Sequence, residues 1–200
     1  MRLHHLRPDE LDADQRAVYD ELTKGSRQQV TTRAPMGVQM IDDDGRLLGP
    51  FNAFLHHPHL GMAVQEVSRR LRFEGVLTHR IREIVILVVA ASQQSDYEWG
   101  AHEAIAIDVG VASDDVARMA RGEPVAFADP AEDAAAALAR SLVATGDADD
   151  AVYTRAHDAL GDRGVIEVST TVGVYQLLAQ QMRLFRVPGP AGPWTRGSPT

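Results

Sequence analysis

The sequence predicts an all-α fold, a compact bundle of several helices. Three observations support it. Segments with helical spacing repeatedly end at a glycine, as at Gly110, Gly146 and Gly161. Residues 165–185 carry an apolar stripe at helical spacing. No pair of alternating apolar segments is joined by a hairpin turn, so the strand signal is missing.

The N-terminal part predicts one helix followed by a long connection. Residues 9–23 place Leu11, Val18 and Leu22 at amphipathic spacing, whereas residues 25–50 are polar and rich in helix breakers. Connections of this length are uncommon inside compact domains. We therefore divide the chain into an N-terminal segment (1–46), a helical domain (47–188) and a Pro/Gly-rich tail (189–200).

Two further helices are expected at residues 52–55 and 60–73, separated by Pro58. Residues 79–91 are nearly all apolar after a charged first turn, which indicates a buried central helix. A buried parallel strand is the alternative, since residues 84–89 are rich in β-branched side chains. No second strand signal follows, so the helix is favoured.

The C-terminal half predicts five more helices. Ser95 and Glu98 have the Ser-x-x-Glu spacing of a capping box and open the first of them. The segments are 95–109, 113–122, 130–145, 148–160 and 165–185, and the last has the stripe Val168, Val172, Tyr175, Leu178 and Met182.

Composition restricts the classes of function. The net charge of −8 and the pI near 5.4 argue against a nucleic-acid binder, which needs a basic surface. The N-terminus lacks the apolar core of a signal peptide, and the longest apolar run, residues 84–91, is too short to span a bilayer. We expect a soluble, cytoplasmic protein without a membrane partner.

The available chemistry is limited by residue usage. The chain has no cysteine, which excludes thiol peroxidase activity and thiolate metal sites. Its single lysine, Lys24, lies in a polar stretch, which argues against a Schiff base. No dinucleotide, phosphate-loop or zinc-protease motif occurs, and His56, His57 and His59 lack the spacing of metal ligands. We expect neither a metal nor a cofactor.

The segment around Glu98 and His102 carries the strongest chemical signal. Four residues apart on a helix, the two side chains lie on one face, and a carboxylate beside an imidazole handles protons. A plain surface ion pair is the alternative. Glu83 lies in the first turn of the preceding helix, where an acid also complements the helix dipole.

One spacing in this region resembles that of the carboxymuconolactone decarboxylase and alkylhydroperoxidase-like family. Eleven residues separate Glu83 from Ser95, two separate Ser95 from Glu98, and three separate Glu98 from His102. Ser95 and Glu98 stand where its peroxidase branch has two cysteines, so the chain resembles a cysteine-free, decarboxylase-like branch. The resemblance covers residues 47–188 and includes the segments 49–56, 71–74, 97–99, 101–103, 127–130 and 164–167.

The resemblance implies a helical bundle that assembles into trimers or hexamers, with a pocket near the subunit contacts. It also implies a site in which His102 is the acid/base, Glu98 orients it, and Glu83 supports the pair. Gly100 replaces a large aromatic residue common in related sequences, which indicates an enlarged pocket.

A wider set of side chains is predicted to bind substrate. Each member also has a structural alternative, as a helix cap, a core or interface aromatic, or an ion-pair partner. The set is Asn52, His56, Arg82, Ser95, Tyr97, Trp99 and Tyr175.

The sequence thus predicts a cofactor-independent carboxy-lyase that decarboxylates an unsaturated lactone, enol or β-keto acid. A proton-transfer isomerase or cyclase of secondary metabolism is an alternative. A non-catalytic ligand-binding or scaffold protein that has lost the family's thiols is another. Apolar surface on residues 84–91 and 165–185 favours a homo-oligomer.

Overall fold

The computed structural model describes residues 1–24 and 40–190, and it confirms the all-α prediction. Within these ranges the one β-type pairing is an isolated bridge between Ile41 and Leu47. Residues 25–39 of the predicted connection and 191–200 of the predicted tail lie outside the described part. The elements in chain order are η1 (Pro8–Glu10), α1 (Ala13–Lys24), α3 (Pro50–His56), α4 (Pro58–Phe73), α5 (His79–Gln93), α6 (Asp96–Asp108), α7 (Ser113–Ala120), α8 (Pro130–Thr145) and α9 (Asp150–Phe185).

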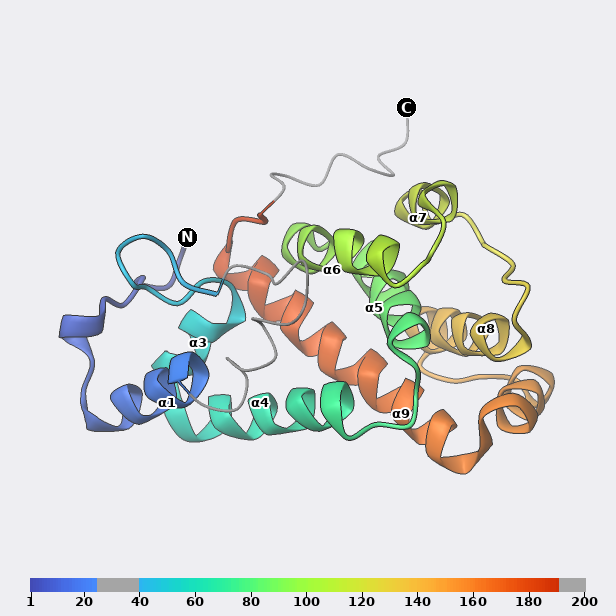
Figure 1. The fold of residues 1–200 in the computed structure, drawn as a ribbon, viewed down its shortest axis with the longest axis horizontal. Helices are drawn as coiled ribbons and strands as arrows, with labels where there is room; N and C mark the ends of the chain where they lie inside the picture. The colour runs from blue at the N-terminus through green and yellow to red at the C-terminus, as the bar shows by residue number, and fades with distance from the viewer. Residues whose placement is uncertain (25–39, 191–200) are drawn as a thin grey trace.

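Helix α5 forms the centre of the bundle, and the alternative of a buried strand is wrong. The Thr78 hydroxyl accepts the Ile81 backbone N–H and caps its start. Residues 84–87 are fully buried because α5 packs against α6, α7, α8 and α9 (Figure 1). Although α5 is strongly apolar, no helix in residues 1–24 and 40–190 is both long and apolar enough to cross a membrane.

Helix α9 crosses the molecule and contacts α3, α4, α5, α6 and α8 (Figure 1). Its backbone leaves helical geometry at Gly161, where φ is 67° and ψ is 175°. This kink explains why the sequence predicted two helices: glycine adopts that conformation without a side-chain clash. Beyond the kink, Val168, Val172, Leu178 and Met182 are buried as their stripe predicted.

The N-terminal segment packs against one end of the helical domain. Helix α1 contacts α3 and α4, and its Val18 and Leu22 join a cluster with Leu47, Phe51 and Leu178. The Arg2 N–H donates to the Phe185 carbonyl at 2.7 Å, which joins the start of the chain to the end of α9.

The face of α9 that points away from the core is exposed and uncharged. Ile166, Leu177 and Leu184 are 64%, 38% and 53% exposed. Between residues 165 and 182 the one charged side chain is Glu167, which is buried and accepts the Val76 and Leu77 N–H groups at 2.6 and 3.3 Å. Residues 84–90, by contrast, are covered within the single chain, so they give no support to self-association.

Candidate active site

Helices α5 and α6 bring Glu83, Glu98 and His102 together in the interior. Their exposed fractions are 1%, 3% and 5%. The Ser95 hydroxyl accepts the Glu98 N–H at 3.4 Å and caps α6, as predicted. The reciprocal half of the capping box is wrong, because the Ser95 N–H donates to the Ala90 carbonyl instead. The Glu98 carboxyl group is therefore left to face the interior.

The contact that orients the imidazole comes from Glu83. Its Oε2 lies 2.6 Å from His102 Nδ1, whereas Glu98 Oε2 lies 3.8 Å from Nε2. The first distance is that of a charge-assisted hydrogen bond and the second is too long for one. Glu83 therefore has the orienting position that the sequence assigned to Glu98.

The hydrogen bond to Glu83 decides which nitrogen of His102 can react. Burial raises the pKa of Glu83, but the His102 contact and the charges of Arg72 and Arg82 outweigh burial and hold the pKa below its usual value. An ionised Glu83 accepts a hydrogen bond from Nδ1–H of His102. The neutral imidazole then presents its lone pair on Nε2, toward Glu98.

Glu98 is a carboxyl group that can hold a proton at neutral pH. Burial raises its pKa to about 7, against the opposing effect of His102 and Arg72. Its Oε1 is buried and has no hydrogen-bond partner among the described residues. An unpaired buried oxygen is costly when ionised, and such perturbed groups cluster at sites that transfer protons.

Arg72 and Tyr175 complete the cluster. The Tyr175 ring meets the imidazole of His102 edge-on, with centroids 5.2 Å apart and an interplanar angle of 84°. Arg72 is hydrogen-bonded to the Tyr175 side chain and lies close enough to lower the pKa of both Glu83 and Glu98. Arg72 belongs to the segment 71–74 that contributed to the family resemblance, but the sequence analysis gave it no role, since its spacing to His102 carries no helical signal.

Two other arginines have structural contacts. Arg82 donates through Nη1 to the carbonyls of Leu71 and Arg72, and its Nε lies 4.0 Å from Glu83 Oε1. It thus ties the end of α4 to the start of α5 beside the cluster. The Arg80 Nε pairs with the Glu132 carboxylate at 2.5 Å, which links α5 to α8.

The remaining predicted substrate-binding residues lie elsewhere. Asn52 and His56 bond the N-terminal segment: the Asn52 amide donates to the His4 carbonyl and accepts the Leu6 N–H, both at 3.1 Å, and the His56 ring lies 2.8 Å from the His4 carbonyl. Trp99 is 1% exposed and belongs to the main core.

Tyr97 lines a separate cavity of about 660 Å³ together with Asn52 and Gly100. The lining of this cavity does not include Glu83, Glu98 or His102. The structure therefore gathers Glu83, Glu98, His102 and Tyr175 in a buried acid/base cluster, and it places Asn52 and Tyr97 at a cavity on the neighbouring face of α6.

Residues 58–141 match the carboxymuconolactone decarboxylase family. This range contains Glu83, Glu98, His102, Arg72 and Arg82, and Tyr175 lies beyond it. A search of curated protein sequences finds no match to the chain.

Three solved structures share the fold at low sequence identity. An uncharacterised peroxidase-related protein with an alkylhydroperoxidase core, from Ralstonia eutropha JMP134, has a TM-score of 0.68 and 17% identity, and the match covers 94% of this chain and 91% of that one. A protein of unknown function from Agrobacterium tumefaciens has a TM-score of 0.61 and 17% identity, and the match covers 70% of this chain and 96% of that one. The debrominase Bmp8, solved with 2,3,4-tribromopyrrole, has a TM-score of 0.63 and 14% identity, and the match covers 84% of this chain and 88% of that one. These similarities confirm an alkylhydroperoxidase-like fold.

Proposed function

We propose that this chain, whose residues 58–141 match the carboxymuconolactone decarboxylase family, is a cofactor-independent carboxy-lyase acting on a small unsaturated or β-keto acid. The observation that carries the proposal is the buried row Glu83–His102–Glu98. In this row one carboxylate is held ionised and the other can hold a proton near neutral pH.

The proposed reaction needs a place for negative charge and a source of one proton. As the bond between the carboxylate carbon and its neighbour breaks, CO₂ leaves and the electron pair remains on the substrate as an enolate. Arg72 supplies the positive charge that stabilises this anion. Glu98, or His102 in its charged form, then donates a proton to the enolate carbon. The donor group regains its proton from the solvent.

The first test is incubation with 4-carboxymuconolactone, with CO₂ release and product followed by mass spectrometry. We expect His102→Ala to lower turnover by roughly 100-fold or more, in the usual range for loss of a general acid/base. His157→Ala is the matched control, because His157 is half-buried on α9, with its Nε2 3.2 Å from Asp162 Oδ1. Equal turnover in His102→Ala and wild type would remove His102 from the chemistry.

A proton-transfer isomerase is the second candidate. It is favoured by the pairing of an acceptor, His102 Nε2, with a donor, protonated Glu98, in one row. Incubation in D₂O distinguishes the two reactions: an isomerase incorporates deuterium into a product of unchanged carbon count, whereas a lyase releases CO₂.

We also propose that α9 is a self-association surface. An uncharged helix face bearing exposed apolar residues is typical of an interface core. We propose that two copies of α9 pack antiparallel, with the two-fold axis passing the helix at the level of residue 175. This register pairs Ile166 with Leu184, Thr170 with Gln180, and Gly173 with Leu177. A Cβ at Gly173 would meet nothing within 4 Å, so this position has room for the partner's leucine. Such a contact is two-fold symmetric and gives an even number of subunits, a dimer or a hexamer.

Light scattering after size-exclusion chromatography tests this register. We expect the wild-type mass to be an even multiple of 21.8 kDa and Leu177→Glu to break the two-fold contact. Leu60→Glu is the control, because Leu60 is 53% exposed but lies on α4. A monomer or a simple trimer for the wild type would contradict the proposed register.

A further inference from the structure

The cavity beside Tyr97 is lined by four segments that are distant in sequence. They are residues 1–5, residues 47–52, one face of α6, and residues 186–190 after α9. Its volume of about 660 Å³ lies within the range of small-molecule sites. Glu98 and His102 project from the neighbouring face of α6, so the cavity is distinct from the acid/base cluster.

Hydrogen bonds hold the walls of this cavity to one another. The Arg2 N–H donates to the Phe185 carbonyl at 2.7 Å, and the His5 ring lies 2.8 Å from the Leu47 carbonyl. The Asn52 amide makes two bonds to the backbone of the N-terminal segment. Because these contacts fix the walls around the space, the cavity is preformed.

Two glycines seat the walls directly on α6. A Cβ on Gly49, where φ is 60°, would lie 2.0 Å from the Tyr97 ring, and one on Gly189 would lie 2.6 Å from the Asp96 carbonyl oxygen. These close approaches require glycine. Between them, α6 presents Gly100, Ala101 and Ala104, whose small side chains leave the interior open.

The charge of the lining is opposite to that of the protein. No carboxylate among the described residues lines the cavity, although the chain carries a net charge of −8. Arg186 lies at its edge in a left-handed conformation, with φ at 53°, as the C-cap of α9. In residues 1–24 and 40–190 its guanidinium has no ion-pair or hydrogen-bond partner. The lining formed by the described residues is therefore mainly apolar and includes the unpaired guanidinium of Arg186.

We propose that this cavity binds a small amphipathic molecule with one negative charge. Its apolar body would contact Leu47, Tyr97 and Val187, and its carboxylate or sulfonate would pair with Arg186, whose planar fork suits such groups. This site does not depend on the proposed lyase activity.

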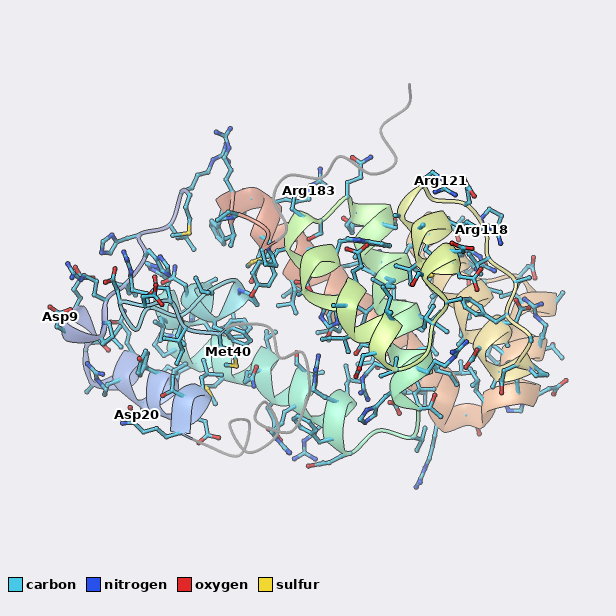
Figure 2. All side chains as sticks on the ribbon, turned by 45° about the horizontal axis from the view of Figure 1, so that its top comes forward. Asp9, Asp20, Met40, Arg118, Arg121 and Arg183 are labelled. Atoms are coloured by element: carbon cyan, nitrogen blue, oxygen red, sulfur yellow. The ribbon has the colours of Figure 1, made fainter. Side chains whose placement is uncertain are left out.

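Two fluorescent probes test the proposal: anionic 8-anilinonaphthalene-1-sulfonate and neutral N-phenyl-1-naphthylamine. Arg186→Gln should weaken binding of the anionic probe about tenfold and leave the neutral one unchanged, because one charge-assisted contact is lost. Ala104→Trp should fill the cavity and abolish binding of both. Arg183→Gln is the matched control, since Arg183 is at the same end of α9 (Figure 2) but bonds the Gln93 carbonyl, outside the cavity lining.

Unchanged affinity for the anionic probe in Arg186→Gln, or absence of binding by the wild type, would overturn the proposal. Arg186 is exposed, so its variant tests the site even where Ala104→Trp does not fold. His102→Ala should retain both probes. Failure of this site and failure of the lyase proposal are thus separate results.

Discussion

Glu83→Ala is expected to lower the free energy of unfolding by about 3–5 kcal/mol, the usual cost of removing one partner from a buried charged pair. The substitution leaves the Nδ1–H of His102 without its acceptor at 2.6 Å. It also leaves the positive charges of Arg72 and Arg82 without the carboxylate that faces them. Urea denaturation followed by circular dichroism measures the loss.

Two variants give this prediction its controls. Glu83→Gln keeps an acceptor for Nδ1–H but removes the charge, so its loss should be intermediate. Glu66→Ala removes a carboxylate that pairs with Arg69 and Arg70 at 2.7 Å on the surface, where the effect should be much smaller. If Glu83→Ala costs no more than Glu66→Ala, the buried pair does not stabilise the fold.

Glu98→Gln is expected to remove a pH dependence of stability. The native Glu98 carboxyl keeps its proton up to about pH 7, whereas an unfolded glutamate releases it near pH 4.5. The native state therefore binds more protons between these values, and its stability falls as the pH rises through this window. The shift corresponds to about 3 kcal/mol. At pH 4.5 the glutamine variant and the wild type should have the same free energy of unfolding. At pH 8 the free energy of unfolding of the variant should be higher than that of the wild type by up to that amount.

Urea midpoints at several pH values, beside Glu21→Gln as an exposed control on α1, measure this difference. The same substitution removes the proposed proton donor. We expect kcat to fall roughly 100-fold or more and the loss of activity above pH 7 to disappear from the rate profile. A variant with wild-type pH dependence of stability would show that Glu98 is ionised throughout the range.

The sequence by itself determined where the helices lie and several of their ends. Ser95, Pro58 and Gly161 act on the backbone within a few residues, so their effects can be predicted without knowing the fold. The spacing of Glu98 and His102 likewise follows from one helical turn. The family resemblance, carried by the motif from Glu83 to His102, was confirmed by the match over residues 58–141.

The tertiary structure decided which of these side chains meet. Glu83 and His102 are on different helices, and the packing of α5 against α6, not sequence spacing, sets their 2.6 Å contact. Arg72 reaches the cluster from α4 and Tyr175 from α9, and neither position shows this locally. The pKa of Glu98 depends on burial by several elements at once. Contacts and electrostatics of this kind depend on distances through space, and these exist only once the chain has folded.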